Sequence, residues 1–349
     1  MIKKRVTIAE VAEAAGVSPT AVSFAFNRPD QLGQETIARI MQAAEELGYA
    51  PNPHAKALLS GRSGALGLLV PQSLVSTFAN PFFATFLEGM GAVCDEKELA
   101  LLTLSPFEDS LEQALARAPV DGFVIVGLNE AHEEVAPLRR RKVPFVIVDG
   151  DSEHVPSVNS DDEEGAYRAA VHLLAQGHRD LRIFTFETPY GHLEYVYYGV
   201  GGRRMRGYRR AFEEAGLGWE EALLHPTVAT IEGGARSFTA AWESGLRPTA
   251  VLAVSDAMAI GIVQAAGALG LDVPGDLEVV GFDDVPLASL VSPALSTVHQ
   301  PIEEKGRTAA ELLVEALEGA RAAQHVLLET ALVLRETTRD AVPYPWPDP

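Results

Sequence analysis

The stretch that most constrains this chain is residues 7–27, which reads TIAEVAEAAGVSPTAVSFAFN. Thr7 can cap a first helix, with a glutamate three residues later to complete a capping box. Gly16 suits the left-handed residue that ends a helix, and Ser18-Pro19 suits the cap and first turn of a second helix. Apolar residues recur at helical spacing on one face of each helix: Ile8, Val11, Ala12 and Ala15, then Val22, Ala25 and Phe26. We therefore predict a helix-turn-helix, whose second helix can enter a DNA major groove.

Residues 34–47 (QETIARIMQAAEEL) predict a third helix that Gly48 would stop. Its inward residues are expected to be Ile37, Ile40, Met41, Ala44 and Leu47. For residues 7–27 alone the alternative is an ordinary helical hairpin, because short helix pairs around a glycine are common. The segment LGYAPNPHAKALLSG at 47–61 weighs against that alternative.

The motifs VTIAEVAEAAGVSPTAVS and LGYAPNPHAKALLSG together resemble the DNA-binding head and hinge of the bacterial LacI/GalR-type transcription regulators. They fall within residues 6–61 and are highly specific, whereas the rest of the chain resembles the family more loosely. The resemblance implies a hinge helix that docks in the minor groove, where Leu58 matches the position of an apolar wedge that kinks the duplex. A helix this short is marginal in water, so we expect it to fold on DNA. A simple linker residue is the alternative for Leu58.

The resemblance assigns DNA contacts to the head and to the hinge. The residues are Thr7, Ser18, Pro19, Thr20, Ser23, Phe24 and Asn27 in the head, and Asn52, Ala55 and Leu58 in the hinge. At the place of Phe24 the family often has an arginine, which reads guanine through two hydrogen bonds. Phe24 cannot do this, so it packs against a thymine methyl group or turns into the core of the head. We predict an operator that departs from the family's usual half-site at that base.

The net charge of −20 is unusual for a DNA-binding chain, but its distribution is uneven. Residues 1–63 carry seven Lys/Arg and six Asp/Glu, which gives +1, so the remainder carries −21. The basic run at 3–5 stands just before the first helix, where positive charge would meet phosphate. We expect only the head to touch operator DNA, and we expect a homodimer, with a tetramer left open.

The chain has 349 residues, which suits a small head and a two-lobed body. No apolar run reaches the roughly 18 residues that a membrane span needs, and the N-terminal residues lack the apolar segment of a signal peptide. The single cysteine, Cys94, fits a reducing compartment. We therefore expect a cytoplasmic protein with no membrane partner.

From Ala65 onward, apolar runs alternate with amphipathic helices, which indicates βαβ units and parallel sheets. The predicted fold class is a small all-α helix-turn-helix head plus an α/β body of two Rossmann-like lobes, which the resemblance likens to periplasmic binding proteins. The expected strands are 65–71, 100–104, 122–127, 143–149, 181–186, 249–255, 277–283 and 295–301, and the expected helices are 81–97, 108–118, 130–141, 162–176, 203–215, 256–269 and 302–318. A last apolar run, HVLLETALVL, occupies residues 325–334.

Four segments are expected along the chain. They are a DNA-binding head at 1–50, a hinge helix and linker at 51–63, a two-lobed effector-binding and dimerisation domain at 64–340, and an irregular tail at 341–349. In the family the late segments cross back between the lobes, which the sequence alone does not show. On that basis the first lobe takes residues 64–160 and 301–324, and the second takes 161–298 and 325–340.

The candidate effector site lies where strands end, because open parallel sheets bind ligands beyond the carboxyl ends of their strands. Arg204 matches the family's effector-binding arginine, three residues before Gly207, and other motifs match further family positions. The expected effector-binding residues are Phe82, Phe83, Asp149, Arg204, Asp256, Asp283 and Gln300. Carboxylates and a guanidinium bind hydroxyls in pairs and a phenyl ring offers an apolar face, so a sugar or nucleoside fits better than a lipid. Asp149 and Asp283 could instead cap turns.

Residues 187–202 (ETPYGHLEYVYYGVGG) depart from the short loop that the family usually has here. The tyrosines of this stretch could line the cleft, pack over it or meet a partner protein. The identity of the ligand is therefore left open.

We predict a transcription regulator, more specifically a repressor, whose operator binding a small molecule controls from the cleft between the lobes. The alternatives are an α/β enzyme or a simple small-molecule-binding protein that uses the same cleft. Against an enzyme, the sequence contains no GxSxG, HExxH or GxxxxGK[ST] motif, and its nine histidines lack zinc spacing. We expect no cofactor and no metal, and the sequence does not tell whether the ligand releases or promotes DNA binding.

Overall fold

A computed structural model of the chain describes residues 6–50, 62–70, 72–105, 111–187, 199–220, 223–320 and 322–340. The chain divides into two units, Met1–Gly64 and Ala65–Pro349. The predictions for the hinge residues Asn52, Ala55 and Leu58, and for residues 188–198 and 341–349, lie outside the described residues.

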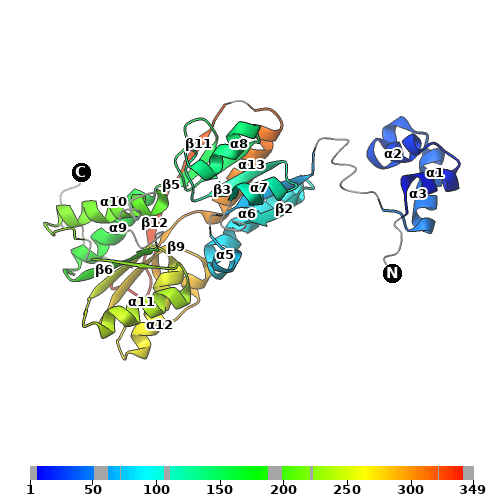
Figure 1. The fold of residues 1–349 in the computed structure, drawn as a ribbon. Helices are drawn as coiled ribbons and strands as arrows, with labels where there is room; N and C mark the ends of the chain where they lie inside the picture. The colour runs from blue at the N-terminus through cyan, green and yellow to red at the C-terminus, as the bar shows by residue number, and fades with distance from the viewer. Residues whose placement is uncertain are drawn as a thin grey trace. The chain divides into compact units, whose positions relative to one another are not determined.

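The first unit holds the predicted helix-turn-helix followed by a third helix (Figure 1). Its elements are α1 (Ile8–Ala15), α2 (Pro19–Asn27), a 3-10 turn (Pro29–Gln31) and α3 (Gln34–Leu47). Small apolar side chains from all three α-helices form its core: Val11, Ala12, Ala15, Val22, Ala25, Ile40, Ala43 and Ala44. These side chains let the short helices approach closely enough to bury a core in so small a unit.

The helix ends of the head follow the predicted cap residues. Thr7 N donates to Glu10 Oε2 at 2.7 Å and Glu10 N donates to Thr7 Oγ1 at 3.4 Å, which completes the capping box of α1. Gly16 ends α1 with a φ of +67°, a conformation that glycine adopts without strain. Ser18 caps α2, with proline at its first position.

The prediction that Met41 and Leu47 point inward is wrong. Their side chains are 45% and 39% exposed. The short helices α1 and α2 cover only a narrow stripe of α3, centred on Ile40 and Ala44, and Met41 is rotated about 100° from Ile40 around the helix.

The first lobe of the body is a parallel six-stranded sheet with the strand order β11-β5-β4-β3-β1-β2. Leu68, Val124 and Val146 point to one face of this sheet, and their neighbours along each strand point to the other. The strands are β1 (Ala65–Leu69), β2 (Ala100–Leu104), β3 (Gly122–Val126), β4 (Phe145–Val148), β5 (Ser157–Ser160) and β11 (His325–Leu328).

Helices cover both faces of this first sheet (Figure 1). Side chains of α6 (Pro81–Glu96) and α13 (Ile302–Leu317) fill the core on one face, and those of α7 (Leu111–Arg117) and α8 (Ala136–Arg141) fill the core on the other. The short helix α5 (Leu74–Ala79) precedes α6.

The second lobe repeats this plan with the strand order β12-β10-β9-β8-β6-β7, parallel except for the β10–β12 pair. Its strands are β6 (Leu181–Phe186), β7 (Leu224–Thr227), β8 (Ala250–Ala253), β9 (Glu278–Asp283), β10 (Ser296–His299) and β12 (Ala331–Val333). Its helices are α9 (Asp162–Ala175), α10 (Gly199–Glu214), α11 (Ile231–Glu243) and α12 (Asp256–Ala268). Helices α9 and α10 pack together, as do α11 and α12.

The chain crosses between the lobes after β5, after β10 and after β11. The expected second-lobe boundary at 325 is therefore wrong, because β11 pairs in parallel with β5 of the first sheet, Val326 opposite Val158. The apolar run at 325–334 divides into β11 and β12, which belong to different sheets. Local sequence cannot show this division, because only pairing with distant strands decides it.

The rhythm of strands and helices predicted most of the body but missed four of its elements, among them the 13-residue helix α11. Strands β5 and β7 and helices α5 and α11 lie in stretches to which no element was assigned. Strand β5 reads SVNS and β7 reads LHPT, so neither carries an apolar run that separates it from a loop. Among the described residues, no helix is both long and apolar enough to cross a membrane.

Candidate functional site

The start of α2 is the part of the head that the sequence assigns to reading DNA. Ser18, Pro19 and Thr20 are all exposed there. Ser18 Oγ accepts a hydrogen bond from Ala21 N at 3.2 Å, which fixes where the helix begins. In a helix-turn-helix, side chains at this end of the second helix reach the base edges. The three side chains are therefore free to meet DNA, and the contact itself stays a prediction.

Phe24 and Phe26 lie in different environments. Phe26 packs on the core of the head, and its ring centroid lies 5.7 Å from that of Tyr49. Phe24 is half-buried and does not belong to that core. Of the two interpretations of Phe24, contact with a thymine methyl group is therefore favoured over packing in the head.

The remaining predicted head residues already make local hydrogen bonds. The Thr7 hydroxyl donates to Glu10 Oε2 at 2.8 Å, and Asn27 Nδ2 donates to Ser23 O at 3.0 Å. These bonds stabilise one end of α1 and one end of α2. A base contact by Asn27 would require its amide group to exchange this bond for one to DNA.

In the body, the residues that end β4 and β9 have unusual backbone conformations. Asp149, Asp283 and Asp284 have φ angles of +56°, +129° and +59°. Residues other than glycine rarely adopt positive φ, and each such residue costs on the order of 1–3 kcal/mol. Strain of this kind concentrates at binding sites, and here it occurs at corresponding strand ends of the two lobes.

A buried lysine occupies the first-lobe side of this region. Lys305 on α13 is 0% exposed, and its Nζ donates to Asp149 Oδ1 at 2.7 Å and to Gln300 Oε1 at 2.6 Å. The same Nζ lies 5.9 Å from the centroid of the Phe82 ring. Two predicted residues, Asp149 and Gln300, are thus brought together by a residue that the sequence analysis did not single out.

Gln300 joins the two lobes. It follows β10 of the second sheet, and its Nε2 donates to Asp283 Oδ1 at 2.7 Å. Its Oε1 accepts from Lys305 and also from Ser160 Oγ, which lies 3.2 Å away at the end of β5 in the first sheet. Lys305, Gln300 and Asp283 therefore form a continuous buried chain of hydrogen bonds from one lobe to the other.

Arg204 completes the chain in the second lobe. Its Nε donates to Asp162 Oδ1 at 3.0 Å, its Nη1 lies 3.7 Å from Asp283 Oδ1, and Nη1 also donates to Val254 O. Its guanidinium carbon lies 3.6 Å from the centroid of the Phe282 ring. The side chain is buried, so its charge is stabilised by these carboxylates and not by water.

Gly207, three residues after Arg204, lies where α10 packs closely on α9. A Cβ atom at Gly207 would lie 2.1 Å from Glu163 O on α9, so only glycine allows α10 to approach that closely. This approach places the first turns of α10 against the start of α9, where Asp162 accepts the hydrogen bond from Arg204.

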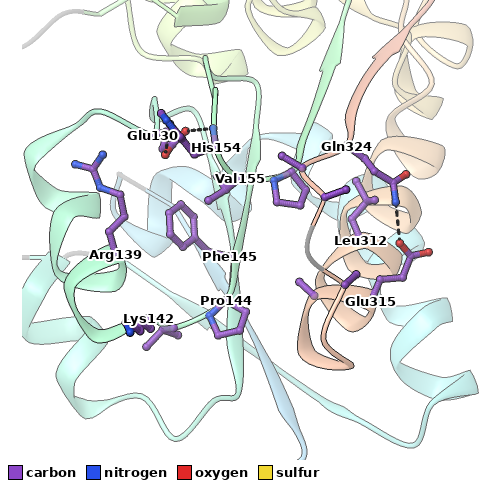
Figure 2. A pocket seen from close by; sticks show the side chains of 16 residues that line it. Glu130, Arg139, Lys142, Pro144, Phe145, His154, Val155, Leu312, Glu315 and Gln324 are labelled. Atoms are coloured by element: carbon purple, nitrogen blue, oxygen red, sulfur yellow. Dashed lines mark hydrogen bonds and ion pairs between the residues drawn. The ribbon is translucent and has the colours of Figure 1, made fainter.

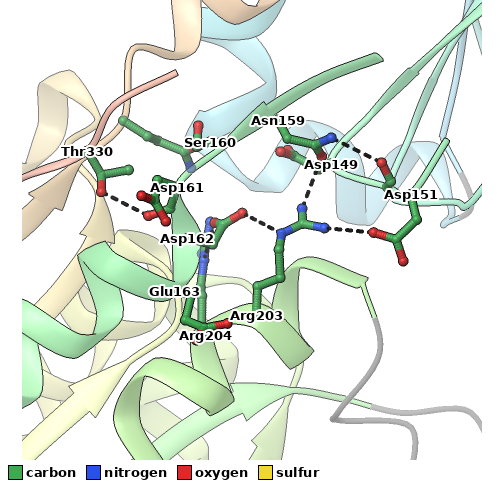
Figure 3. Close-up of polar contacts among 12 residues, drawn as sticks. Asp149, Asp151, Asn159, Ser160, Asp161, Asp162, Glu163, Arg203, Arg204 and Thr330 are labelled. Carbon is green, nitrogen blue, oxygen red and sulfur yellow. Dashed lines mark hydrogen bonds and ion pairs between the residues drawn. The ribbon is translucent and has the colours of Figure 1, made fainter. Parts of the chain in front are cut away.

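The neighbouring Arg203 links the lobes at the same point, as Figure 3 shows. Its Nε donates to Asp162 Oδ2 at 3.1 Å in the second lobe. On the first lobe, Nη2 donates to Asn159 Oδ1 at 3.2 Å and Nη1 lies 3.6 Å from Asp151 Oδ1.

Asp256 has a different place from the one expected. Its carboxylate is fully buried and accepts from Val285 N at 2.9 Å and from Thr297 Oγ1 at 2.5 Å. A Cβ atom at Gly281 would lie 2.3 Å from Asp256 Oδ1, so the glycine of β9 makes room for this carboxylate. Asp256 therefore holds the turn after β9, behind the chain formed by Lys305, Gln300, Asp283 and Arg204.

Burial raises the pKa of both carboxyls at this end of β9. Loss of hydration, together with the charge of Asp283, raises the pKa of Asp256 to about 8. Loss of hydration also raises the pKa of Asp283, to about 6, although the nearby Arg204 guanidinium and the bond from Gln300 act in the opposite direction.

Phe82 and Phe83 belong to the core of the first lobe. Their ring centroids lie 5.2 Å apart in an edge-to-face arrangement at the start of α6, and both are buried. Val285, which follows β9 of the second sheet, is buried in the same core. The apolar contact between the lobes is thus continuous with the polar chain beside it.

Comparison with known proteins identifies the two units separately and the chain as a whole. Residues 7–52 match the family described as bacterial regulatory proteins, lacI family, and residues 170–338 match the periplasmic binding protein-like domain. The HTH-type transcriptional regulator DegA of Bacillus subtilis is 31% identical, over 96% of this chain and 98% of its own length. The chain belongs to the LacI family of bacterial regulatory proteins.

Two further matches extend over nearly the whole chain. The HTH-type transcriptional repressor PurR of Vibrio campbellii is 31% identical, over 95% of this chain and 98% of its own length. The solved structure of the transcriptional regulator CelR in complex with cellobiose is 29% identical with a TM-score of 0.69, and it covers 95% of this chain and 100% of its own. LacI-family proteins are transcription regulators, so this chain is a DNA-binding regulator and not an enzyme.

Two pockets of this LacI-family body include only one of the predicted effector residues, Gln300. One of about 590 Å³ is lined by Phe145, Leu312 and Gln324 at the amino ends of the first-lobe strands (Figure 2). The other, of about 600 Å³, is lined by Gln300 together with Asp284 and others. The remaining predicted effector residues line neither pocket, because they are buried against one another.

Sequence reasoning missed Lys305, Asp162 and Arg203, which hold the predicted residues together. One signal was available for Lys305, which lies on the same helical face as Ile302 and Ala309, so it interrupts an apolar stripe. In the part of the body that the structure describes, no group of three or more His, Cys, Asp or Glu side chains could hold a metal ion.

Proposed function

We propose that this protein is a repressor whose affinity for operator DNA is set by a small molecule bound between the two lobes of its body. The observation that carries the proposal is the buried polar chain from Lys305 through Gln300 and Asp283 to Arg204, which joins the carboxyl ends of strands from both sheets. Burial of so many charges costs free energy even when they are paired, so we infer that they serve a purpose beyond packing, and a binding site at the point where two lobes meet supplies one.

On the DNA side, the exposed start of α2 reads the major groove and Leu58 enters the minor groove. Phe24 contacts a thymine methyl group where an arginine would read guanine. The relative named as the repressor PurR supports the direction of control. A DNA partner supports a cytoplasmic location.

The working unit we propose is a homodimer that binds a near-palindromic operator with one head on each half-site. In the first lobe, α5 exposes Val75 and Phe78, with exposed fractions of 83% and 62%. Adjacent exposed apolar side chains of this kind are typical of a protein–protein interface. A second copy is the occupant that two symmetric half-sites require.

The effector we propose is hydroxyl-rich, either a sugar or a nucleoside. The polar chain contains carboxylates, which can accept hydrogen bonds from hydroxyls, and a guanidinium, which can donate two hydrogen bonds. The CelR structure, which was solved with cellobiose, supports a sugar, and the relatives named PurR leave a purine compound as the second choice.

The test combines a thermal-shift screen with a DNA-binding assay on the full-length protein. The operator is obtained by selecting bound sequences from random DNA, and the screen uses sugars, nucleosides and purines. A ligand at about 100 times its Kd adds about 2.7 kcal/mol of stability, so a true effector raises Tm clearly. The same ligand is expected to change operator affinity by about 5- to 150-fold.

Arg204→Ala is expected to abolish the shift, whereas Arg206→Ala is the matched control, because Arg206 is exposed and pairs with Glu163 on the surface. A ligand that stabilises the protein and leaves operator affinity unchanged would contradict the proposal. So would a ligand whose effect survives in Arg204→Ala.

A further inference from the structure

Lys305 is an unusual residue for the inner face of α13. It lies on the stripe that packs against the first sheet, and its side chain is fully buried. An ammonium group is expensive to remove from water even when it is paired, and an apolar side chain of similar length would fill the same space. Packing of the lobe therefore does not account for a lysine here.

The surroundings of the Lys305 ammonium show what it can recognise. An ammonium has three donors, and the structure gives two of them acceptors, Asp149 Oδ1 and Gln300 Oε1. A donor and a carboxylate thus lie side by side, 2.7 Å apart, with the Phe82 ring 5.9 Å from the ammonium nitrogen. Two hydroxyls on adjacent carbons match this arrangement, because one can donate to the carboxylate while the oxygen of the other accepts from the ammonium.

The charges around the pair select against an ionised ligand. Each of the three cations, Lys305, Arg203 and Arg204, already has a carboxylate partner. Arg203 and Arg204 share Asp162, and Asp283 lies 3.7 Å from Arg204 Nη1, so three carboxylates balance the three cations. A ligand anion would therefore lie close to the acidic side chains of Asp149, Asp162 and Asp283, whose charges oppose it. A neutral ligand avoids that repulsion and can still use every donor and acceptor.

We propose that Lys305 is a specificity-determining residue of the effector site, which together with Asp149 binds a neutral vicinal diol. The inference rests on the proposed function and deepens it by naming the chemical group that is recognised. Gln300 bonds to both Lys305 and Asp283, so the diol site on the first lobe is connected directly to the second lobe. A diol of this kind is present in a free sugar and in the ribose of a nucleoside.

The experiment measures Kd by calorimetry on the full-length protein with a panel of defined probes. Glucose, ribose and cellobiose represent neutral sugars, and adenosine represents a nucleoside diol. The controls that lack the diol or carry a charge are 2′-deoxyadenosine, gluconate and glucose 6-phosphate. At least one neutral diol is expected to bind, and its deoxy or anionic counterpart is expected to bind at least about 10-fold more weakly, as for loss of a bond to a charged group. The panel also separates the two sources, because a sugar site prefers the free sugars and a nucleoside site prefers adenosine.

The variants separate recognition from folding. Lys305→Met leaves Asp149 buried without its partner, so the double variant Asp149→Asn/Lys305→Met, which removes both charges, tests the same point in a body without an unpaired charge. Both are expected to bind the diol about 10- to 100-fold more weakly. Lys142→Met, at an exposed lysine of the same lobe, is the matched control and is expected to behave as the unchanged protein.

The outcomes distinguish this inference from the proposed function. A double variant that binds the diol with unchanged affinity would show that Lys305 is structural only and would overturn the inference. Tighter binding of gluconate or glucose 6-phosphate than of any neutral probe would do the same, although control by a ligand would still stand. If no probe of this panel binds, the inference fails, and the proposed function still stands if another ligand of the thermal-shift screen changes operator affinity. If no ligand of that wider screen changes operator affinity, the proposed function fails as well.

Discussion

At the scale of single residues, Asp256 and Asp283 share one end of β9 and are both buried. They have different roles. Asp283 bonds to Gln300 in the chain that joins the lobes, whereas Asp256 holds Val285 N and Thr297 Oγ1 behind it. Because burial raises the pKa of Asp256 to about 8, this carboxyl is mostly protonated at neutral pH and reduces the repulsion that Asp283 would otherwise feel.

The raised pKa of Asp256 predicts how stability changes with pH. Between its ordinary pKa of 3.8 and the folded value of about 8, the folded chain holds a proton that the unfolded chain has released. This carboxyl therefore lowers the free energy of unfolding as the pH rises through that window. Asp256→Asn removes the titration and keeps the shape, so its stability relative to the unchanged protein is expected to grow by more than about 1 kcal/mol from pH 5 to pH 8.

Urea denaturation of both proteins at pH 5, 6.5 and 8 measures this difference. Asp95→Asn, at an exposed carboxylate of α6, is the matched control and is expected to show no such trend. A constant difference between Asp256→Asn and the unchanged protein at all three pH values would mean that Asp256 is ionised throughout.

The sequence reveals a site residue when that residue belongs to a recognisable motif. Arg204 and Gln300 stand beside short motifs, so they could be assigned without coordinates. Lys305 and Asp162 have no motif of their own, and their roles depend on partners up to 156 residues away, as for Lys305 and Asp149. The solvent exposure of the effector residues could not be predicted either. The sequence predicts that the residues at the strand ends lie together, but not that they are buried against one another.

At the scale of elements, glycines let pairs of helices pack at backbone distance. A Cβ atom at Gly207 would lie 2.1 Å from Glu163 O, one at Gly306 would lie 2.1 Å from Phe86 O, and one at Gly261 would lie 1.9 Å from Ile231 O. These contacts join α10 to α9, α13 to α6, and α12 to α11. The first pair carries Arg203 and Arg204, and the second carries Lys305, so the same contacts that build the lobes also position the polar chain.

Gly207→Ala tests this link between helix packing and the site. The added methyl group has to push α10 away from α9, which is expected to destabilise the body by about 1–3 kcal/mol, as overpacking does. It is also expected to weaken ligand binding, because Arg204 moves away from Asp162. Chemical denaturation and calorimetry on the same protein measure the two effects.

Gly267→Ala in α12 is the matched control, because a Cβ atom there meets nothing within 4 Å. Alanine is the better helix former, so this variant is expected to gain about 0.5–1 kcal/mol and to bind ligand normally. If Gly207→Ala were as stable as this control, the close packing of α10 on α9 would not exist in solution.

The sequence predicts most of the long elements, with the 13-residue helix α11 as an exception, and misses pairings that depend on distant partners. Helices α9, α12 and α13 were predicted to within a residue or two, since α9 and α13 carry an apolar stripe longer than three turns and α12 is a long run of small and apolar residues. The assignment of β11 and β12 to different sheets depends on pairing with β5 and β10, which lie up to 168 residues earlier along the chain. Periodicity contains no information about such pairing.

At the scale of the whole molecule, the body is two similar lobes whose contact contains both an apolar core and a chain of charges. The chain crosses between them after β5, β10 and β11, so neither lobe is a continuous segment. A ligand can shift the balance between two arrangements of such lobes only by as much as its affinities for them differ. The bonds of Gln300 and Arg203 to both lobes are the contacts through which that difference can act.

Operator binding is expected to depend on the dimer, because one head alone would make few contacts with DNA. With a charge of +1 on residues 1–63, its electrostatic attraction to phosphate is weak, so two linked heads are needed to hold an operator. If the exposed apolar face of α5 joins two copies, then Val75→Asp/Phe78→Asp is expected to convert dimers into monomers and to weaken operator binding by about 100-fold or more. Sedimentation and a gel-shift titration measure the two effects.

Leu327→Asp is the matched control, since Leu327 is also an exposed apolar residue, 66% exposed, but lies on the edge strand β11. It is expected to leave both the dimer and operator binding unchanged. A double variant on α5 that remains dimeric would place the interface elsewhere on the body, and an unchanged protein that sediments as a monomer on its operator would contradict the two-headed arrangement altogether. Because the α5 substitutions are on the surface, a loss of stability is not expected to mimic the result.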